Sequence, residues 1–265
     1  MLIGKAKPVT SGLCRYDAHS ITVRERNLAQ DLMGHMSFTG FFFFLTTGQQ
    51  ATPKQVLFLD TLLISLTEHG MTPTAQTARM TYAADPNALQ AAVAAGILGC
   101  GSVVLGTAER CGETLIAAAR KVASGNDVNT AALATAKEVK SQGKTMPGFG
   151  HPIHKPVDPR SERLLELAES EGIEGAHIAL VRAFPAAVEQ VWGKPLTMNV
   201  SMMIAAVLLD LDFPPGMLKA IPILARTAGL LAHLAEEQRE SIGFMLAHYA
   251  EAAVEYRPQS DGGEL

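Results

Sequence analysis

Two histidines three residues apart lie in a loop rich in glycine and proline, and they are the first candidates for chemistry. The segment from Gly148 to Lys155 reads GFGHPIHK and contains His151 and His154. Glycine lets a ligand approach the backbone closely, proline stiffens the chain, and an imidazole can donate or accept a proton near neutral pH. The spacing also occurs in metal sites, but no helix holds this pair on one face and no third ligand follows, so we expect no metal. The alternative is a surface loop whose histidines are only solvated.

A second candidate is an arginine in an apolar segment. Arg226 lies within IPILARTAGLLAH, and in a helix it shares one face with Gly229 and His233. We expect the core stripe of this helix on another face, at Met217, Ile221, Leu224, Ala228 and Leu231. A guanidinium in apolar surroundings needs an anion or hydrogen-bond acceptors, so its partner is either a carboxylate-bearing ligand or an internal salt bridge. His69, between two expected helices, is either a catalyst or a packing or capping residue.

The composition excludes several classes of protein. The 265 residues carry 22 Lys and Arg against 26 Asp and Glu, a formal net charge of −4, and no basic cluster is long enough to track nucleic-acid phosphates. With 48% apolar and 18% charged residues the chain can bury a large core, so disorder is excluded for most of it. The three cysteines, Cys14, Cys100 and Cys111, form no CxxC pair, which argues against a disulfide framework or a cysteine-rich zinc site.

Two segments of the sequence indicate whether the protein is secreted or spans a membrane. The first fifteen residues contain no unbroken apolar stretch of the kind that directs secretion, so we expect a cytoplasmic protein. The stretch 88–108 is free of charge over 21 residues, but alanine, serine and glycine dilute its apolarity, and its flanks lack a Lys/Arg asymmetry. We therefore expect a buried central helix there and no membrane span.

The apolar pattern predicts an all-α fold that positions these residues. Apolar side chains recur at spacings of three and four, and no alternation typical of strands extends past the first thirty residues. A capping residue before proline predicts helix starts at Thr52-Pro53, Thr72-Pro73, Asp85-Pro86 and Asp158-Pro159. Further helices are expected at 126–142, 176–191, 198–211 and 214–238, with a loop at 146–159 and a disordered tail after residue 257.

Several blocks of the sequence occur together, and in the same order, in one known superfamily. They are EHG at 68–70, the glycine-rich segment 102–109, GFGHPIHKPVDPR at 148–160, LTMNVS at 196–201 and ARTAGLLAH at 225–233. The opening SFTGFFFFLTTGQQATPKQ at 37–55 also fits, so the resemblance spans nearly the whole chain. On these blocks the sequence resembles the citrate synthase superfamily, and more closely its citryl-CoA lyase-like branch.

The resemblance implies a two-domain, all-helical fold. A large domain, residues 1–110 and 216–265, would carry a small domain, residues 111–215, that closes over the substrate. Members of the family form homodimers with their sites in the cleft between the domains. We expect the same arrangement, with a homodimer as the working state.

The resemblance also implies an activity. The expected reaction is retro-aldol cleavage of a 3-hydroxyacyl-CoA of the citryl-CoA type into an acyl-CoA, such as acetyl-CoA, and an oxo-acid, such as oxaloacetate. His151 would take the hydroxyl proton. His69, Arg226 and Lys155 would hold the oxo-acid fragment. Further candidates are His154 and Asn199 for substrate binding, and Gly148, Gly150 and Lys144 for contact with CoA.

Two positions depart from the family's catalytic set. Leu105 stands where the synthases carry the histidine that stabilises the enolate, and Ser201 stands where they carry the aspartate that moves the α-proton. A positioned general base contributes a factor of about 10²–10⁴, and a neutral hydroxyl does not replace it. Condensation is therefore the least favoured activity, and Ser201 or water would relay a proton to the enolate. The open alternatives are a condensing enzyme with an unusual base and a non-catalytic protein that binds CoA thioesters or organic acids.

The remaining expectations concern partners. The sequence contains no glycine-rich phosphate loop, so another protein, an acyl-CoA synthetase, would supply the thioester. The CoA thioester enters as a substrate. We expect no permanently bound cofactor, no metal, no nucleic acid and no membrane.

Overall fold

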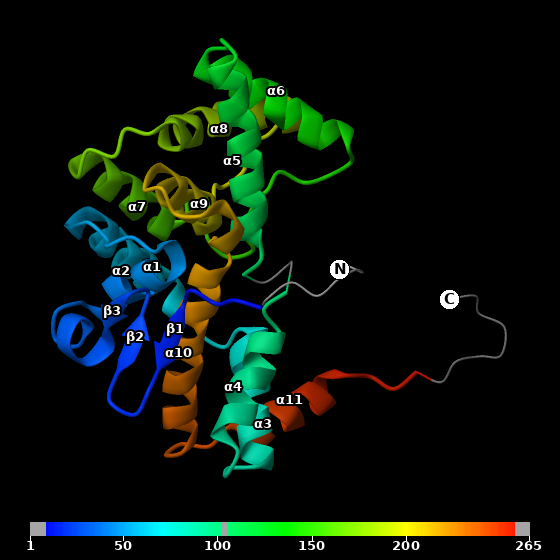
Figure 1. Cartoon of the computed structure of the whole chain (residues 1–265). Helices are drawn as coiled ribbons and strands as arrows, with labels where there is room; N and C mark the ends of the chain where they lie inside the picture. The colour runs from blue at the N-terminus through cyan, green and yellow to red at the C-terminus, as the bar shows by residue number, and fades with distance from the viewer. Residues whose placement is uncertain (1–8, 102–104, 258–265) are drawn as a thin grey trace.

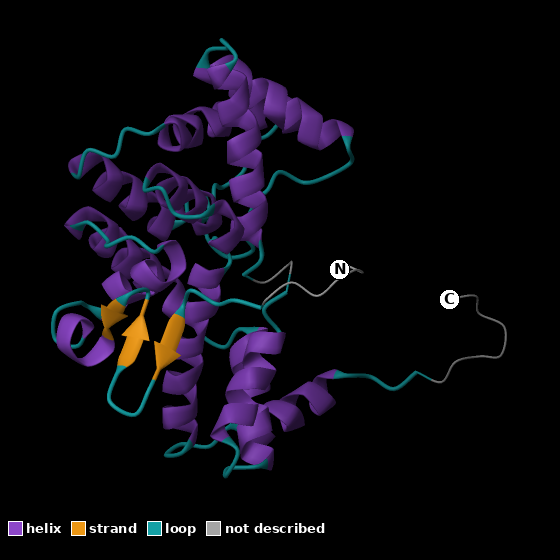
Figure 2. Cartoon of the chain, in the orientation of Figure 1, coloured by secondary structure: helices purple, strands orange, loops and turns teal. Residues whose placement is uncertain are grey.

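The computed structural model describes residues 9–101 and 105–257, and within these ranges it is built mainly of helices (Figures 1 and 2). In chain order the α-helices are α1 (Phe38–Thr47), α2 (Pro53–Thr67), α3 (Pro73–Ala84), α4 (Leu89–Leu98), α5 (Thr107–Ala123), α6 (Val128–Ser141), α7 (Pro159–Ser170), α8 (Ala176–Trp192), α9 (Val200–Asp210), α10 (Ala220–Glu237) and α11 (Gly243–Ala253). A π-helical turn, η1 (Leu28–Leu32), precedes α1, and a 3₁₀ turn, η2 (Pro215–Met217), precedes α10. Strands β1 (Cys14–Tyr16), β2 (Ile21–Val23) and β3 (Arg26–Asn27) form a small antiparallel sheet in that order. The predicted all-α class is confirmed, and the described strands all lie within the first thirty residues.

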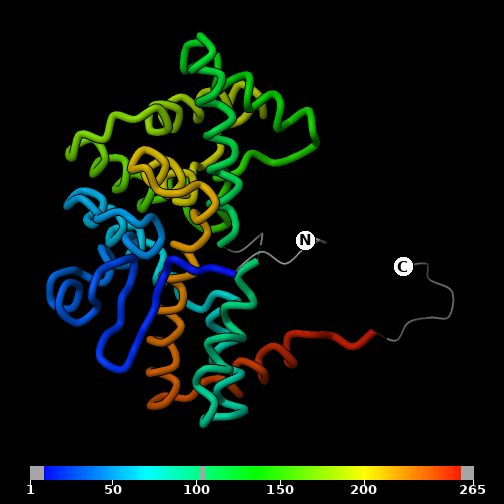
Figure 3. The backbone as a smooth tube through the Cα atoms, in the orientation of Figure 1, coloured from blue at the N-terminus to red at the C-terminus, as the bar shows by residue number. Residues whose placement is uncertain are grey.

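The helices form two groups, as the tube in Figure 3 shows. Helices α5 to α9 pack on one another at one end of the molecule, and α2, α3 and α4 pack against α10 at the other, with α11 against α3. The layout agrees with a large and a small domain. The boundaries at residues 110 and 215 stay predictions.

The main core belongs to the first group and extends into α2. Helix α9 is buried at Val200 and from Met202 to Leu209, and Leu62 and Leu66 of α2 join the same apolar cluster. A smaller core between α3, α4 and α10 is built from Ala75, Ala78, Tyr82, Ala92, Leu230 and Leu234. The start of α9 and the end of α2 therefore meet where the two groups join.

Most predicted helix starts are confirmed, because they depend on local chemistry. Thr52 caps α2 by accepting from the backbone of Gln55, with Pro53 at the first turn. Asp127 and Asp158 cap α6 and α7 by accepting backbone N–H bonds. The expected loop separates α6 from α7.

The prediction of one long buried helix at 88–108 is wrong. Asp85 ends α3, and its carboxylate accepts from the backbone N–H of Asn87 at 3.1 Å, so Asp85-Pro86 opens a turn and not a helix. Helix α4 begins at Leu89 and stops at Leu98, whose side chain is 87% exposed. Residues 102–104, like the tail 258–265, lie outside the described residues.

One described stretch, Pro215–Glu237, is long and apolar enough to cross a membrane by length and composition alone. Half of its apolar window is buried inside the protein, and it includes the buried polar residues Arg226, His233 and Glu237. These features are typical of the core helix of a globular domain, so the stretch is weak evidence for a membrane span.

The buried face of α10 agrees with the predicted core stripe only in part. Ile221 of that stripe is buried, but Leu231 and Met217, which lies in η2, are 44% and 41% exposed. Arg226 and His233, expected on the opposite face, are buried, with Gly229 between them. The polar face of α10 is thus turned into the protein, where it needs partners.

Candidate active site

The histidine loop is tied to the segment that precedes α9. Gly150 N donates to the carbonyl oxygen of Thr197 at 2.7 Å, and Asn199 N donates to that of Gly148 at 2.8 Å. The Asn199 side chain donates to the Gly150 carbonyl at 3.0 Å. Gly148 has φ +74°, and a Cβ at this position would lie 2.8 Å from Met202 Cβ, so glycine is required there. Three predicted site residues, Gly148, Gly150 and Asn199, therefore fix the shape of this loop.

The backbone of the loop sets the protonation pattern of His151. Its Nδ1 accepts from the N–H groups of Ile153 at 3.1 Å and of His154 at 2.9 Å. A neutral imidazole has one donor and one acceptor nitrogen, so its proton lies on Nε2. In this arrangement His151 offers a donor to a ligand. Its predicted role in removing a proton would require the ring to give up the Nε2 proton first.

Two further imidazoles complete a three-histidine cluster. His69 follows α2, and its Nε2 lies 3.2 Å from Nε2 of His154, although 85 residues separate them in sequence. The ring of His151 lies 4.4 Å from that of His154 and 5.9 Å from that of His69, measured between centroids. One nitrogen of the His69–His154 pair must donate and the other accept, so this pair can exchange a proton.

The surroundings of the cluster keep two of its rings neutral. Burial, followed by the charge of Arg160 and the proximity of the His154 ring, lowers the pKa of His69 below its ordinary value. Burial and the neighbouring His154 likewise lower the pKa of His151. Neutral rings at physiological pH can both donate and accept hydrogen bonds.

The same cluster has the composition of a metal site, with a third ligand that the HxxH spacing did not reveal. One ring nitrogen from each of His69, His151 and His154 lies within 4.8 Å of the other two. A metal ligand needs a free lone pair, however, and that of His151 Nδ1 is taken by two backbone donors, which leaves the proton on Nε2. The donor set therefore fits a metal poorly in this arrangement.

Arg226 supplies a buried positive charge without an internal partner. The residue is 4% exposed, and its Nε and Nη1 atoms are buried without a hydrogen-bond partner. Burial lowers its pKa, but an arginine stays charged in proteins. None of the ion pairs among the described residues involves Arg226. A buried guanidinium of this kind is the expected receptor for a carboxylate.

Arg160 supplies a second, firmly held cation. Its Nε and Nη2 atoms bind the two oxygens of Asp158 at 3.0 and 2.8 Å. Asp158 is fully buried and also accepts from the backbone N–H of Val200 at 3.1 Å. Burial alone would raise the pKa of Asp158, but hydrogen bonds and the charge of Arg160 hold it below its ordinary value. Asp158 thus fixes Arg160 to the start of α9.

These groups surround a cavity of about 370 Å³ where the two helix groups meet. The lining comprises Leu66, His69, Thr72, Leu105, Thr107, Arg110, Thr145, Met146, Pro147, Gly148, Phe149, Gly150, His151, Pro152, Arg160, Asn199, Val200, Ser201 and Arg226. Among these described residues there is no aspartate or glutamate. The described lining is therefore cationic and contains no carboxylate base.

The structure brings together most of the predicted site residues. His69, His151, Ser201, Asn199 and Arg226 line the cavity, and His154 joins it through its contact with His69. The two glycines of the histidine loop also line it, as does Leu105.

The two predicted lysines lie elsewhere. Lys155 is exposed and does not line the cavity, and Arg160 stands there in its place, so the prediction of Lys155 as the carboxylate-binding cation is wrong for this cavity. Lys144 lines a neighbouring cavity of about 510 Å³ between α5 and α6, and Arg110, Thr145 and Pro147 line both cavities. The sequence Asp158-Pro159-Arg160 indicates a helix start. It does not indicate that the side chains of Asp158 and Arg160 pair with each other.

Comparison with known families and proteins places these features in context. The family described as "Citrate synthase, C-terminal domain" matches residues 6–245. A protein from Mycobacterium tuberculosis described as "Putative citrate synthase 2" is 30% identical over 202 residues, which is 74% of this chain and 52% of that protein. The chain thus spans about half the length of the curated relatives it matches.

Solved structures show the same relationship in three dimensions. The citryl-CoA lyase from Hydrogenobacter thermophilus superposes with a TM-score of 0.83 at 29% identity, covering 98% of both chains. An ATP citrate lyase from Methanothrix soehngenii, solved with citrate and coenzyme A, superposes with a TM-score of 0.79 at 19% identity over 99% of this chain and 44% of that one. The citrate synthase from Thermotoga maritima superposes with a TM-score of 0.64 at 19% identity over 86% and 58%. The last two similarities establish the fold.

Proposed function

The chain belongs to the citrate synthase superfamily, in its citryl-CoA lyase-like branch, and from this premise we propose that it is a carbon–carbon lyase acting on a CoA thioester. The proposed substrate is a 3-hydroxyacyl-CoA of the citryl-CoA type. The products are an acyl-CoA such as acetyl-CoA and an oxo-acid such as oxaloacetate. The observation that carries the proposal is the buried, unpartnered guanidinium of Arg226 beside three imidazoles.

The cationic end of the cavity suits the oxo-acid fragment. Arg226 has two buried donor atoms without partners, so a substrate carboxylate would satisfy them. Arg160 presents a second cation held in place by Asp158. His151, with its proton on Nε2, can donate to the oxygen that is a hydroxyl in the thioester and a carbonyl in the oxo-acid. A carboxylate-bearing oxo-acid matches all of these groups.

The cleavage step follows from these positions. His151 holds the hydroxyl oxygen, and a neighbouring imidazole of the His69–His154 pair accepts the hydroxyl proton. The carbon–carbon bond then breaks, and its electron pair passes to the thioester fragment as an enolate while the hydroxyl carbon becomes the carbonyl of the oxo-acid. The enolate carbon takes a proton from water, directly or through Ser201. The imidazole returns its proton to water, and no other reactant is needed.

Leu105 and Ser201 also line the cavity, and we assign the acyl group to them, at what we call the acyl end. Condensation requires a base that removes a proton from the α-carbon of the acyl-CoA, and such a base contributes a factor of about 10²–10⁴. Leu105 has no titratable group, and the hydroxyl of Ser201 is a poor base. A hydroxyl or a water molecule can nevertheless deliver a proton to an enolate.

We assign the CoA part of the substrate to the neighbouring cavity between α5 and α6. This cavity shares Arg110, Thr145 and Pro147 with the first, so a long thioester could extend from one to the other. Lys144 lines it and offers a charge for phosphate groups. In this proposal CoA is a substrate, another enzyme of the acyl-CoA synthetase class supplies the thioester, and the protein acts as a cytoplasmic homodimer.

A second candidate function is non-catalytic binding of a CoA thioester or organic acid. The observation that favours it is the absence of aspartate and glutamate from the described lining, together with Leu105 and Ser201 at the acyl end. Binding would use the cations at the other end and would require no proton transfer.

One experiment separates the two functions. The purified protein is incubated with citryl-CoA and a panel of other 3-hydroxyacyl-CoA thioesters, and mass spectrometry measures the shorter acyl-CoA and the oxo-acid. We expect both products in equal amounts from one member of the panel. His151→Ala should lower their formation at least about 100-fold, whereas His19→Ala, which changes an exposed histidine in the β1–β2 turn, should leave it unchanged.

Each alternative outcome has a clear meaning. If no thioester is cleaved but CoA thioesters raise the melting temperature by mass action, the binding function replaces the lyase function. If cleavage proceeds at the same rate in His151→Ala, the assigned site is wrong.

A further inference from the structure

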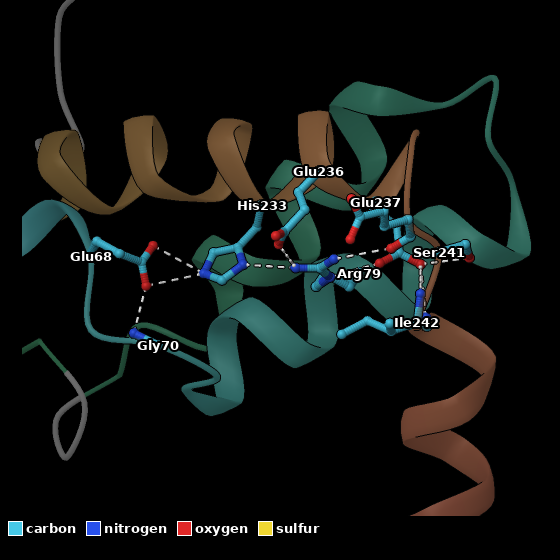
Figure 4. Close-up of polar contacts among 10 residues, drawn as sticks. Glu68, Gly70, Arg79, His233, Glu236, Glu237, Ser241 and Ile242 are labelled. Carbon is cyan, nitrogen blue, oxygen red and sulfur yellow. Dashed lines mark hydrogen bonds and ion pairs between the residues drawn. The ribbon is translucent and has the colours of Figure 1, made fainter.

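A chain of polar side chains leads from the interior of the second helix group, where Arg79 and His233 are buried, to the half-exposed Glu68, the residue before His69 (Figure 4). It begins at Arg79 of α3, whose side chain is 1% exposed. The Nε atom of Arg79 binds Glu237 at 2.6 Å, and its Nη1 atom binds Glu236 at 2.5 Å. Glu237 is itself held by the backbone N–H of Gly243 at 2.7 Å. These bonds hold the Arg79 side chain in place.

The donors and acceptors along this series of side chains can be arranged in only one way. Arg79 Nη1 lies 3.2 Å from Nδ1 of His233, and a guanidinium can only donate. Nδ1 of His233 is therefore an acceptor, and the proton of a neutral ring lies on Nε2. Nε2 lies 3.0 Å from Glu68 Oε2 and 3.2 Å from Oε1, so His233 donates to Glu68. The tautomer of His233 is thus fixed by Arg79, 154 residues away in sequence.

Glu68 in turn holds the backbone at His69 through hydrogen bonds. Its Oε1 atom accepts from the backbone N–H of His69 at 2.8 Å and from that of Gly70 at 2.5 Å. These bonds hold the turn that follows α2. They set the backbone position from which the His69 side chain reaches the cavity and His154.

The same arrangement keeps Glu68 away from Arg226. Glu68 is the negative group whose charge acts most strongly on Arg226, yet no hydrogen bond or ion pair between the described residues joins the two. The two residues lie close because α10 presses against the end of α2, where a Cβ on Gly229 would lie 1.9 Å from the Thr67 carbonyl oxygen. With its oxygens occupied by His233 and two backbone N–H groups, Glu68 leaves Arg226 free for a ligand.

We infer that Glu68 and His233 are positioning residues for the oxo-acid end of the site: His233 holds Glu68, and Glu68 holds His69 in the cavity while Arg226 stays unpaired. The inference rests on the proposed function for its effect on substrate, but the effect on His69 can be measured without substrate. Neither residue lines the cavity, so neither contacts the substrate there.

The test compares two variants of His233. His233→Gln can keep both polarities, with the amide N–H₂ towards Glu68 and the amide oxygen towards Arg79, whereas His233→Leu removes both. We expect kcat/KM for citryl-CoA, or for whichever thioester is cleaved, to fall about 10- to 100-fold in His233→Leu, the range expected for misplaced groups. The loss should appear mainly in KM, because released Glu68 can then pair with Arg226. His233→Gln should stay within about threefold of the parent protein.

A third variant tests the direction of the chain. Glu68→Gln can still accept the two backbone N–H groups, but its amide N–H₂ then faces the N–H of His233, and two donors cannot bond. We expect Glu68→Gln to displace His69 as His233→Leu does, but without the rise in KM that a released carboxylate would cause by pairing with Arg226. Glu189→Gln on α8, whose side chain is exposed and forms no hydrogen bond or ion pair with the described residues, is the matched control and should be unchanged.

An NMR measurement makes the inference independent of activity. Imidazole ¹⁵N–¹H spectra report the tautomer and environment of each histidine, and a His69→Gln spectrum identifies the His69 signals. We expect these signals to shift in His233→Leu and Glu68→Gln and to be restored in His233→Gln. If the parent protein cleaves no thioester but these shifts occur, the proposed function fails and the inference stands. If the His69 signals are the same in all variants, the inference is overturned, and if His233→Leu does not fold, Glu68→Gln and His233→Gln decide.

Discussion

The residues that we assign to the two parts of the proposed substrate differ sharply in chemistry. The oxo-acid end presents Arg160 and Arg226 together with the imidazoles of His69 and His151. Leu105 and Ser201, which we assign to the acyl group, carry no titratable side chain, and Arg110 adds a further cation to the lining of the cavity. The residues assigned to the oxo-acid can therefore bind an anion strongly, whereas the pair assigned to the acyl group supplies no base.

Recognition of a carboxylate and proton transfer at the α-carbon place different demands on the residues of the cavity. A buried cation recognises a carboxylate whether or not any reaction follows, because its pairing is electrostatic. Proton removal from an α-carbon needs a base at one defined place, and the acyl end has none among its described residues. In the proposed cleavage the cations and imidazoles supply recognition and the step that removes the hydroxyl proton, and protonation of the enolate is left to water or Ser201.

The largest expected effect comes from removing the cation at the oxo-acid end. Arg226→Met keeps most of the side-chain volume and deletes the charge. We expect oxo-acid affinity, measured by calorimetry with oxaloacetate, to fall about 100-fold, because a charge-assisted pair of hydrogen bonds is lost. We also expect the free energy of unfolding, from urea denaturation without ligand, to rise by about 1–3 kcal/mol, because an unpartnered buried guanidinium is replaced by an apolar group.

The matched control for this prediction is Lys155→Ala. It removes a positive charge from the same loop region, but Lys155 is exposed and outside the cavity. Affinity should change by less than about twofold. An equal loss in both variants would show that net charge, and not the position of Arg226, determines binding.

Some features of the fold could be predicted from the sequence, and others could not. Helix starts at Thr52, Asp127 and Asp158 were predictable, because a cap and its backbone donors lie within three residues. Asp85 has the same sequence signal, but its carboxylate closes a turn on Asn87 at the end of a preceding helix. Local residue types alone do not distinguish these two outcomes.

The site was predictable only in part, for a related reason. His151 and Arg226 lie in blocks that resemble a known family, and their placement in the cavity followed from that resemblance. The buried face of α10 could not be found from apolar periodicity, because His233 is buried against Arg79, far away in sequence, and Arg226 is buried beside the cavity with two donor atoms that have no hydrogen-bond partner. A charged residue in the core is predictable only when its partner is known.

A smaller effect is expected from adding a base at the acyl end. Ser201→Asp restores a carboxylate near the start of α9, where the helix dipole also favours negative charge. We expect the exchange of the acetyl-CoA methyl protons with deuterated water, followed by mass spectrometry, to rise about tenfold, below the full range of a well-placed base. Ser201→Asn, which adds similar volume without the charge, should give no increase.

The outcome bears directly on the difference between the two ends. A rise in exchange would mean that the acyl end is a family site lacking only its base. A loss of cleavage without a rise in exchange would mean that a neutral group at position 201 is required, and that the acyl group is not acetyl.

The smallest effect expected is a dependence of stability on pH that arises at the oxo-acid end. Burial and neighbouring positive charges hold the pKa values of His69 and His151 below the ordinary value of 6.5. As pH falls, the unfolded chain binds protons on these rings before the folded chain does, so protonation favours unfolding. We expect the free energy of unfolding from urea titrations to be fully present above about pH 7 and to decrease as pH falls through 6.5 towards the lowered pKa values.

The double variant His69→Gln, His151→Gln should flatten this dependence between pH 5 and 7, and His35→Gln, which changes an exposed histidine outside the cavity, should not. The buried carboxylates Asp158 and Glu237 also have lowered pKa values, but their contribution is lost only at more acidic pH, below the ordinary range of a carboxyl group. A slope in this window that persists in the double variant would assign it to other groups. In that case the imidazoles of the oxo-acid end would not be held neutral by the fold, and the proton step proposed for them would lose its acceptor.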